Sequence, residues 1–264
     1  MSKDSSKLPK TSEVSAKPSR KSWRPWLGVI VGMAALFGSQ IIIGIVLSIY
    51  PAIRGWDATK SNNWLTNSIV VQFIFVALAE TLAVAIIYFF LKRYKGAFKE
   101  IGIRKPKWLD PVYGLLGLPA YLAIYFVALN IVTKLAPNIN VNEKQQLGFN
   151  SPHGALELTL TFISLVVLPP IAEEIVFRGL IFTSLKKWIP MWGAVIGTSL
   201  LFAAGHLAEG GSAGLLYIAA IDTFSLSLVL IYLREKTDGL WASMTLHALK
   251  NGIAFVALFA LHLT

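Results

Sequence analysis

Long apolar runs separated by short polar segments dominate this sequence and restrict its fold more than any other feature. Seven such runs occur at residues 26–53, 67–91, 111–133, 158–185, 191–207, 215–233 and 239–263. A helix needs about 20 apolar residues to cross the hydrocarbon core of a bilayer. Charged residues make up only 14% of the chain, against about 25% in soluble domains. The sequence therefore predicts an all-α, polytopic helical membrane protein with about seven to eight transmembrane helices.

The basic residues indicate how such a chain is oriented. The net charge is +10, and Lys and Arg concentrate in residues 1–24 and in the segments 92–107, 186–187 and 234–236. Cytoplasmic loops carry this excess, so we expect a cytoplasmic N-terminus and no binding of nucleic acid. Residues 1–24 are polar enough to be disordered. The chain has no cysteine, which excludes disulfides, thiolate metal sites and cysteine nucleophiles.

Two adjacent glutamates and an arginine interrupt the fourth apolar run. Ionisable groups at membrane depth usually face the protein interior or a wet cavity and mark function. Glu174 and Arg178 are four residues apart, so they can pair on one helix face. Glu173 is rotated from Glu174 by about 100° and is expected to be available for chemistry. The alternative is a buried ion network that only holds the helices together.

Two prolines, Pro169 and Pro170, directly precede this motif. Proline has no N–H and clashes with the preceding turn, so we expect a kink that leaves carbonyl groups without their helical donors. Irregular backbone at membrane depth is tolerated where it lines a cavity, and such a cavity would give water a route to Glu173. The alternative is a kink that serves packing alone.

Further polar side chains lie at comparable depth in later runs. Phe202 and His206 share one helix face, as do His247 and Asn251. Counted at 1.5 Å per residue from the cytoplasmic ends, Glu173 lies roughly 20 Å deep, His206 roughly 22 Å, His247 roughly 12 Å and Asn251 roughly 18 Å. Because unrelated polar residues need not agree in depth, we expect these groups to form one site.

This set of side chains suits the attack of water on an amide. Glu173 would act as general base on a water that His206 helps to position. His247 and Asn251 would donate to the oxyanion on the scissile carbonyl. A second version of this mechanism uses a zinc ion to activate the water, with Glu173, His206 and His247 as the possible Zn²⁺ ligands. The helical zinc motif H-E-x-x-H is absent, and spacing alone leaves both versions open.

The three motifs together resemble those of a known family. They read E-E-x-x-x-R at Glu173, Glu174 and Arg178, F-x-x-x-H at Phe202 and His206, and H-x-x-x-N at His247 and Asn251. This pattern is similar to the CPBP (CAAX protease and bacteriocin-processing, or Abi) intramembrane proteases, which are related to type II CAAX prenyl endopeptidases. The resemblance implies catalytic roles for Glu173, His206, His247 and Asn251 and supporting roles for Glu174, Arg178 and Phe202.

The resemblance also implies a substrate and an organisation. We expect a membrane-associated protein or peptide substrate in the lipid bilayer, and in a bacterial cell membrane a role in peptide or bacteriocin maturation or in self-immunity. The expected parts are a basic tail at 1–24, N-terminal transmembrane helices at 25–153 and the peptidase core at 154–264. Two alternatives stay open, a non-catalytic member of the fold that binds and regulates a partner, and an ion-coupled transporter.

Overall fold

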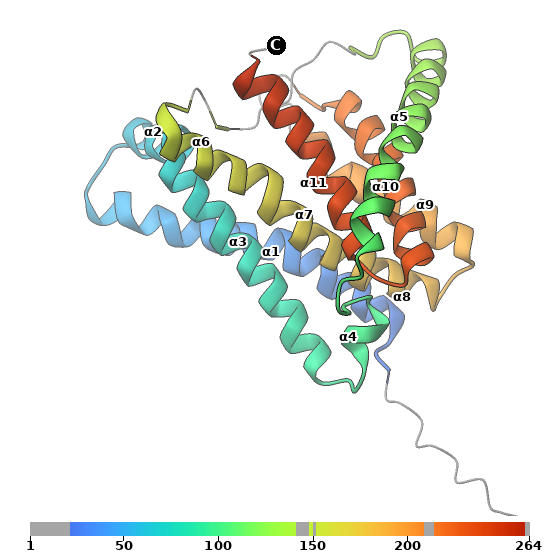
Figure 1. The fold of residues 1–264 in the computed structure, drawn as a ribbon. Helices are drawn as coiled ribbons and strands as arrows, with labels where there is room; N and C mark the ends of the chain where they lie inside the picture. Colours follow the sequence, from blue (N-terminus) through green and yellow to red (C-terminus); the bar gives the residue numbers. More distant parts are fainter. Residues whose placement is uncertain (1–21, 141–147, 150–151, 209–213, 262–264) are drawn as a thin grey trace, which may run out of the picture.

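The computed structural model describes residues 22–140, 148–149, 152–208 and 214–261, and all regular structure within them is helical (Figure 1). The N-terminal half contains α1 (Pro25–Ile53), α2 (Ala58–Asn67), α3 (Ile69–Lys92), α4 (Ala97–Glu100) and α5 (Leu109–Leu135). One long helix follows, made of α6 (Gly154–Phe162), η1 (Ile163–Val167), α7 (Leu168–Glu173), η2 (Glu174–Ile181) and α8 (Phe182–Lys186). The remaining elements are α9 (Met191–Gly205), α10 (Tyr217–Thr237), α11 (Trp241–Phe255) and η4 (Val256–Ala260).

Six helices in the described residues are long and apolar enough to cross a membrane. They are Pro25–Ile53, Ile69–Lys92, Leu109–Leu135, Gly154–Lys186, Tyr217–Thr237 and Trp241–Phe259. The fifth predicted run forms the shorter α9, whose 15 residues rise only about 22 Å, less than the ~30 Å hydrocarbon core. The prediction of an all-α polytopic membrane protein is confirmed, with six long spans and one short apolar helix in the described part of the chain.

The long helix from Gly154 to Lys186 lies at the centre of the bundle. Helices α1 and α3 pack together on one side of it, and α9, α10 and α11 lie on the other side (Figure 1). Helix α5 packs against α10 and α11. Two segments of the central helix, η1 and η2, are π-helical. Because π-helical turns are rare and are frequently found at functional sites, this helix is a candidate to carry the site.

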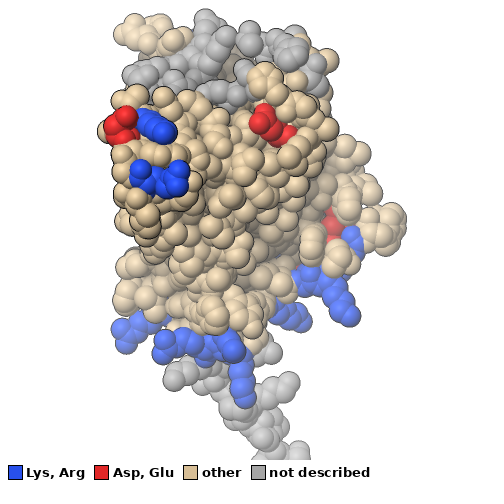
Figure 2. Space-filling model, turned by 90° about the vertical axis from the view of Figure 1, so that its left-hand side faces the viewer, with Lys and Arg blue, Asp and Glu red and all other residues tan. Residues whose placement is uncertain are grey.

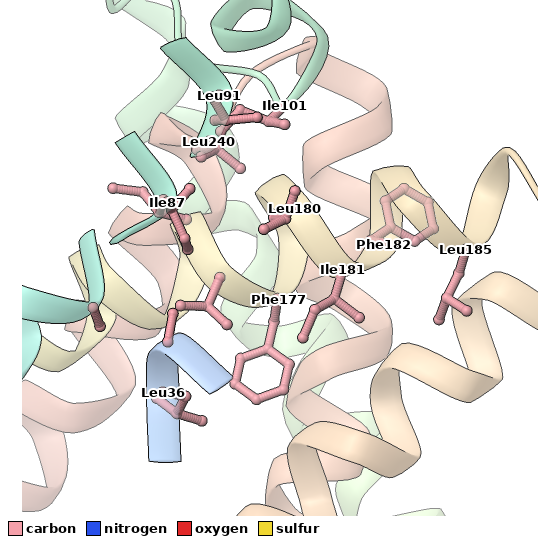
Figure 3. Packing of buried hydrophobic residues seen from close by; sticks show 14 of the residues in the cluster. Leu36, Ile87, Leu91, Ile101, Phe177, Leu180, Ile181, Phe182, Leu185 and Leu240 are labelled. Atoms are coloured by element: carbon pink, nitrogen blue, oxygen red, sulfur yellow. The ribbon is translucent and has the colours of Figure 1, made fainter. Parts of the chain in front are cut away.

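The largest cluster of buried apolar side chains surrounds η2. All eight residues of η2 are buried. Figure 3 shows Phe177, Leu180 and Ile181 of this segment among side chains from other elements, including Leu36 of α1 and Ile87 of α3. Two charged residues of the E-E-x-x-x-R motif, Glu174 and Arg178, therefore lie in a segment that is enclosed by packed apolar residues.

Charged side chains are sparse across the middle of the visible surface. In Figure 2, Lys and Arg gather towards the lower end of this face, few charged groups lie across its middle, and a few of both signs lie near its upper end. This arrangement agrees with a membrane-spanning bundle that has one basic end. Disorder is predicted for residues 1–24, and residues 1–21 of this tail lie outside the described residues. Residues 262–263 of the last predicted run also lie outside them.

One polar segment differs from the sequence interpretation, which treats it as a connection between the first two spans. Residues Ala58–Asn67 form α2, and the Asp57 side chain caps this helix by accepting a hydrogen bond from the Lys60 backbone N–H at 2.7 Å. The rings of Tyr50, Trp56 and Trp64 contact one another, two of the three pairs edge to face, and Trp64 belongs to α2. The N-cap and the aromatic contacts give a polar segment enough local stability to be helical.

Candidate active site

The two adjacent glutamates lie where α7 passes into η2. Glu173 is the last residue of α7, and Glu174 is the first residue of η2. The Glu173 side chain is 17% exposed and lines a cavity, whereas the Glu174 side chain is 0% exposed. Neighbouring carboxylates thus have different surroundings, one at the wall of a wettable space and one in the packed interior.

Glu174 has two charged or ionisable partners in the interior. Arg178 Nη1 lies 3.0 Å from Glu174 Oε1, which confirms the predicted pairing. His247 Nδ1 lies 3.1 Å from the same oxygen. A carboxylate only accepts hydrogen bonds, so Nδ1 carries the proton and donates to Glu174. His247 Nε2 then faces Glu173, with 3.7 Å between Nε2 and Glu173 Oε2.

His206 is fixed by the helix that it follows. It comes directly after the last residue of α9, and its Nδ1 lies 2.9 Å from the carbonyl oxygen of Phe202, four residues earlier. The last carbonyls of a helix lack intrahelical donors, so the ring caps this end. Because a carbonyl only accepts, Nδ1 is the donor and Nε2 is the acceptor nitrogen of neutral His206.

Phe202 explains why the second motif contains an aromatic residue. Its ring is fully buried, and the Arg178 Cζ atom lies 4.2 Å from the ring centroid. The same ring contacts His206 edge-on at 4.7 Å and His247 at 5.8 Å between ring centroids. One apolar side chain therefore packs against the guanidinium and both histidines and restricts their positions.

Asn251 binds a backbone carbonyl that the prolines leave without a helical donor. Pro169 has no N–H, so the carbonyl of Leu165, four residues earlier, loses its normal partner. Asn251 Nδ2 donates to this oxygen at 2.9 Å. An amide nitrogen carries two N–H groups, so one is used here and the second can still serve the oxyanion role that the sequence predicts.

One cavity of about 190 Å³ brings the four predicted catalytic residues together. Glu173, His206, His247 and Asn251 all line it, although they come from three separate helices. At about 30 Å³ for each water, the cavity has room for several molecules. Glu174, Arg178 and Phe202 lie behind the wall rather than in it, as supporting residues would.

The zinc version of the mechanism stays a prediction. Within the part of the chain that the structure describes, no group of three or more His, Asp or Glu side chains is arranged to hold a metal ion. His247 Nδ1 already donates to Glu174, so only Nε2 could act as a ligand. A catalytic zinc takes three protein ligands, and the expected set is Glu173, His206 and His247.

Three polar residues that sequence reasoning leaves without a role join this region. Lys250 and Asp222 both line the cavity, with 2.7 Å between Lys250 Nζ and Asp222 Oδ2. The Tyr121 hydroxyl donates to the other oxygen of Asp222. The signal in the sequence is a pair of opposite charges in successive spans, but spacing does not reveal that they meet.

Comparison with known families gives one finding. Residues 155–253 match the family described as type II CAAX prenyl endopeptidase Rce1-like. No curated protein and no solved structure matches the chain. The matched segment contains all three motifs, from Glu173 to Asn251, so the family resemblance drawn from those motifs is confirmed.

Proposed function

We propose that this protein hydrolyses a peptide bond of a membrane-associated protein or peptide, and the match of residues 155–253 to the Rce1-like type II CAAX prenyl endopeptidases supports this. The supporting observation is that Glu173, His206 and His247 line one cavity within a bundle of membrane-spanning helices. A carboxylate and two histidines around a wettable space suit activation of water.

The first step forms the bond between water and the substrate. Glu173 removes a proton from a water molecule, and the water oxygen attacks the carbonyl carbon of the scissile bond. His206 Nε2 accepts a hydrogen bond from the other O–H of that water and so orients it. Nε2 has this role because Nδ1 already donates to the Phe202 carbonyl. The electron pair of the C=O bond moves to oxygen, which becomes an oxyanion.

The second step stabilises this oxyanion and breaks the peptide bond. Glu174 accepts a hydrogen bond from His247 Nδ1 and would stabilise the doubly protonated ring, the form that donates to the oxyanion through Nε2. The second N–H of Asn251 is a further donor. When the intermediate collapses, the C–N bond breaks and Glu173 returns its proton to the leaving amine.

Purified protein in lipid nanodiscs tests this proposal with a library of N-acylated peptides and mass spectrometry of the products. We expect the wild type to cleave at least one member, and Glu173→Ala and His206→Ala to lower the rate by about 10²–10⁴-fold. Glu157→Ala is the matched control, because Glu157 lies near the start of the same central helix and outside the cavity lining.

The outcomes separate the proposed mechanism from its rivals. Cleavage that survives Glu173→Ala would overturn the mechanism. Stable capture of a membrane protein by wild type that cleaves no peptide would support the non-catalytic alternative, and coupled ion uptake into vesicles would support the transporter. In a bacterial host, the proposed role is the maturation of a peptide or self-immunity, which peptide profiles of cells with and without the protein would test.

A further inference from the structure

A cluster of three polar side chains, two of which line the cavity, takes no part in the mechanism above. Tyr121 comes from α5, Asp222 from α10 and Lys250 from α11. The Lys250 and Asp222 side chains are 21% and 18% exposed, whereas Tyr121 is only 5% exposed. The ion pair therefore borders the cavity, and the tyrosine supports it from the interior.

Lys250 lies on the same face of α11 as two of the reacting groups. His247, Lys250 and Asn251 stand at i, i+3 and i+4, which is one face of a helix, and all three line the cavity. An ammonium group has three N–H donors, and Asp222 accepts one of them. Asp222 also accepts from Tyr121, so its charge is shared between two donors and Lys250 can hold a second acceptor.

The remainder of the cavity is largely apolar. Phe255, Leu258 and Phe259 line it as well, and they follow Lys250 along α11 and η4. A charged lysine is costly at membrane depth, and such residues usually face a cavity and mark a ligand pathway. A ligand that is mainly apolar but carries one negative group would match both parts of this wall.

We propose that Lys250, oriented by Asp222 and Tyr121, is a specificity-determining residue that binds a carboxylate of the substrate. This inference rests on the proposed peptidase function and names the class of substrate, an apolar peptide segment with one carboxylate near the scissile bond. His247 and Lys250 are separated by a rise of about 4.5 Å along α11, and an extended peptide advances about 3.4 Å per residue. The carboxylate therefore lies within a few residues of the bond that is cut.

The carboxylate has two chemical sources, the free C-terminus of the peptide or an acidic side chain. Binding is measured by fluorescence anisotropy with full-length Glu173→Gln protein in nanodiscs, so that no probe is consumed. The probes are a labelled apolar decapeptide as free acid, the same peptide as C-terminal amide, and two amidated versions that carry Glu or Gln at an internal position. We expect at least one carboxylate probe to bind about tenfold to hundredfold more tightly than its neutral match.

Variants of the ion pair distinguish recognition from a structural role. Lys250→Met in the same background should abolish this preference, while the control Lys236→Met, at an exposed lysine near the end of α10, should keep it. The double exchange Asp222→Lys with Lys250→Asp keeps an ion pair and covers the case in which Lys250→Met does not fold. We expect the exchanged pair to remain folded and to lack the preference for the carboxylate.

Each result has a defined consequence. A preference for the free acid assigns the site to the C-terminus, and a preference for Glu over Gln assigns it to a side chain. Equal binding of all four probes, or a preference that persists in Lys250→Met or in the exchanged pair, would overturn the inference. A carboxylate preference in Glu173→Gln protein without any cleavage by wild type would overturn the peptidase proposal and leave the carboxylate site standing.

Discussion

The two adjacent glutamates should respond in opposite ways when each is replaced by glutamine. Glu174 is fully buried, and its Oε1 lies 3.0 Å from Arg178 Nη1 and 3.1 Å from His247 Nδ1. Glu173 lies at the wall of the cavity with 17% of its side chain exposed. Glutamine keeps the size of glutamate and removes its charge, so the pair of variants isolates the contribution of each charge to folding and to catalysis.

The expected loss of stability for Glu174→Gln follows from the charge that it leaves behind. Arg178 is 0% exposed, and an arginine side chain does not deprotonate in a protein. Removing one partner of a buried ion pair costs about 3–5 kcal/mol. At about 2–4 °C per kcal/mol for a chain of this size, Tm falls by about 6–20 °C. Glu173→Gln should change the free energy of unfolding by less than about 1 kcal/mol.

Thermal unfolding in detergent, followed by the fluorescence of the eight tryptophans, measures the Tm of both variants. A peptide cleavage assay measures their catalytic rates. We expect Glu174→Gln to lower both Tm and cleavage, because it also releases His247. We expect Glu173→Gln to lose cleavage at an almost unchanged Tm. Equal Tm losses in the two variants, or a wild-type Tm in Glu174→Gln, would refute this division of roles.

Three further changes test the surroundings of the site. Phe202→Leu removes the ring beneath Arg178, which lies 4.2 Å from its centroid; it should cost about 2 kcal/mol and lower kcat, measured by unfolding and cleavage. Gly114→Val should cost about 1–3 kcal/mol, because a Cβ there would lie 2.7 Å from Thr245 Cβ, whereas Gly38→Val has open space and should unfold like wild type. Finally, 1,10-phenanthroline should leave cleavage unchanged and metal analysis should find no stoichiometric zinc; loss of activity restored by zinc would contradict the metal-free mechanism.

The membrane-spanning helices could be predicted because the bilayer imposes a simple rule on length and polarity. The second predicted span, 67–91, agrees closely with Ile69–Lys92. Helix α2 was missed because its composition is polar, although Asp57 directly before it is a recognisable N-cap. The shortness of α9 was also missed, because the apolar run continues to residue 207, past the point at which His206 ends the helix.

The candidate site could be predicted in part, since helical periodicity shows which residues share a face. Periodicity predicted the pairing of Glu174 with Arg178. The estimated depths in the membrane then predicted that the motif residues lie close to one another. Periodicity does not show which faces of different helices meet. For that reason the contact of His247 with Glu174 and the pairing of Asp222 with Lys250 required the structure.

The third motif also sets the register of two helices, which gives its spacing a physical reason. His247 binds Glu174, and Asn251 binds the Leu165 carbonyl that Pro169 leaves without a donor. Along α11 the order is His247 then Asn251, whereas along the central helix Leu165 precedes Glu174, so the two contacts fit only antiparallel helices. The proline therefore creates the acceptor that helps to hold α11 in place, and this contact keeps His247 beside Glu173 and Glu174.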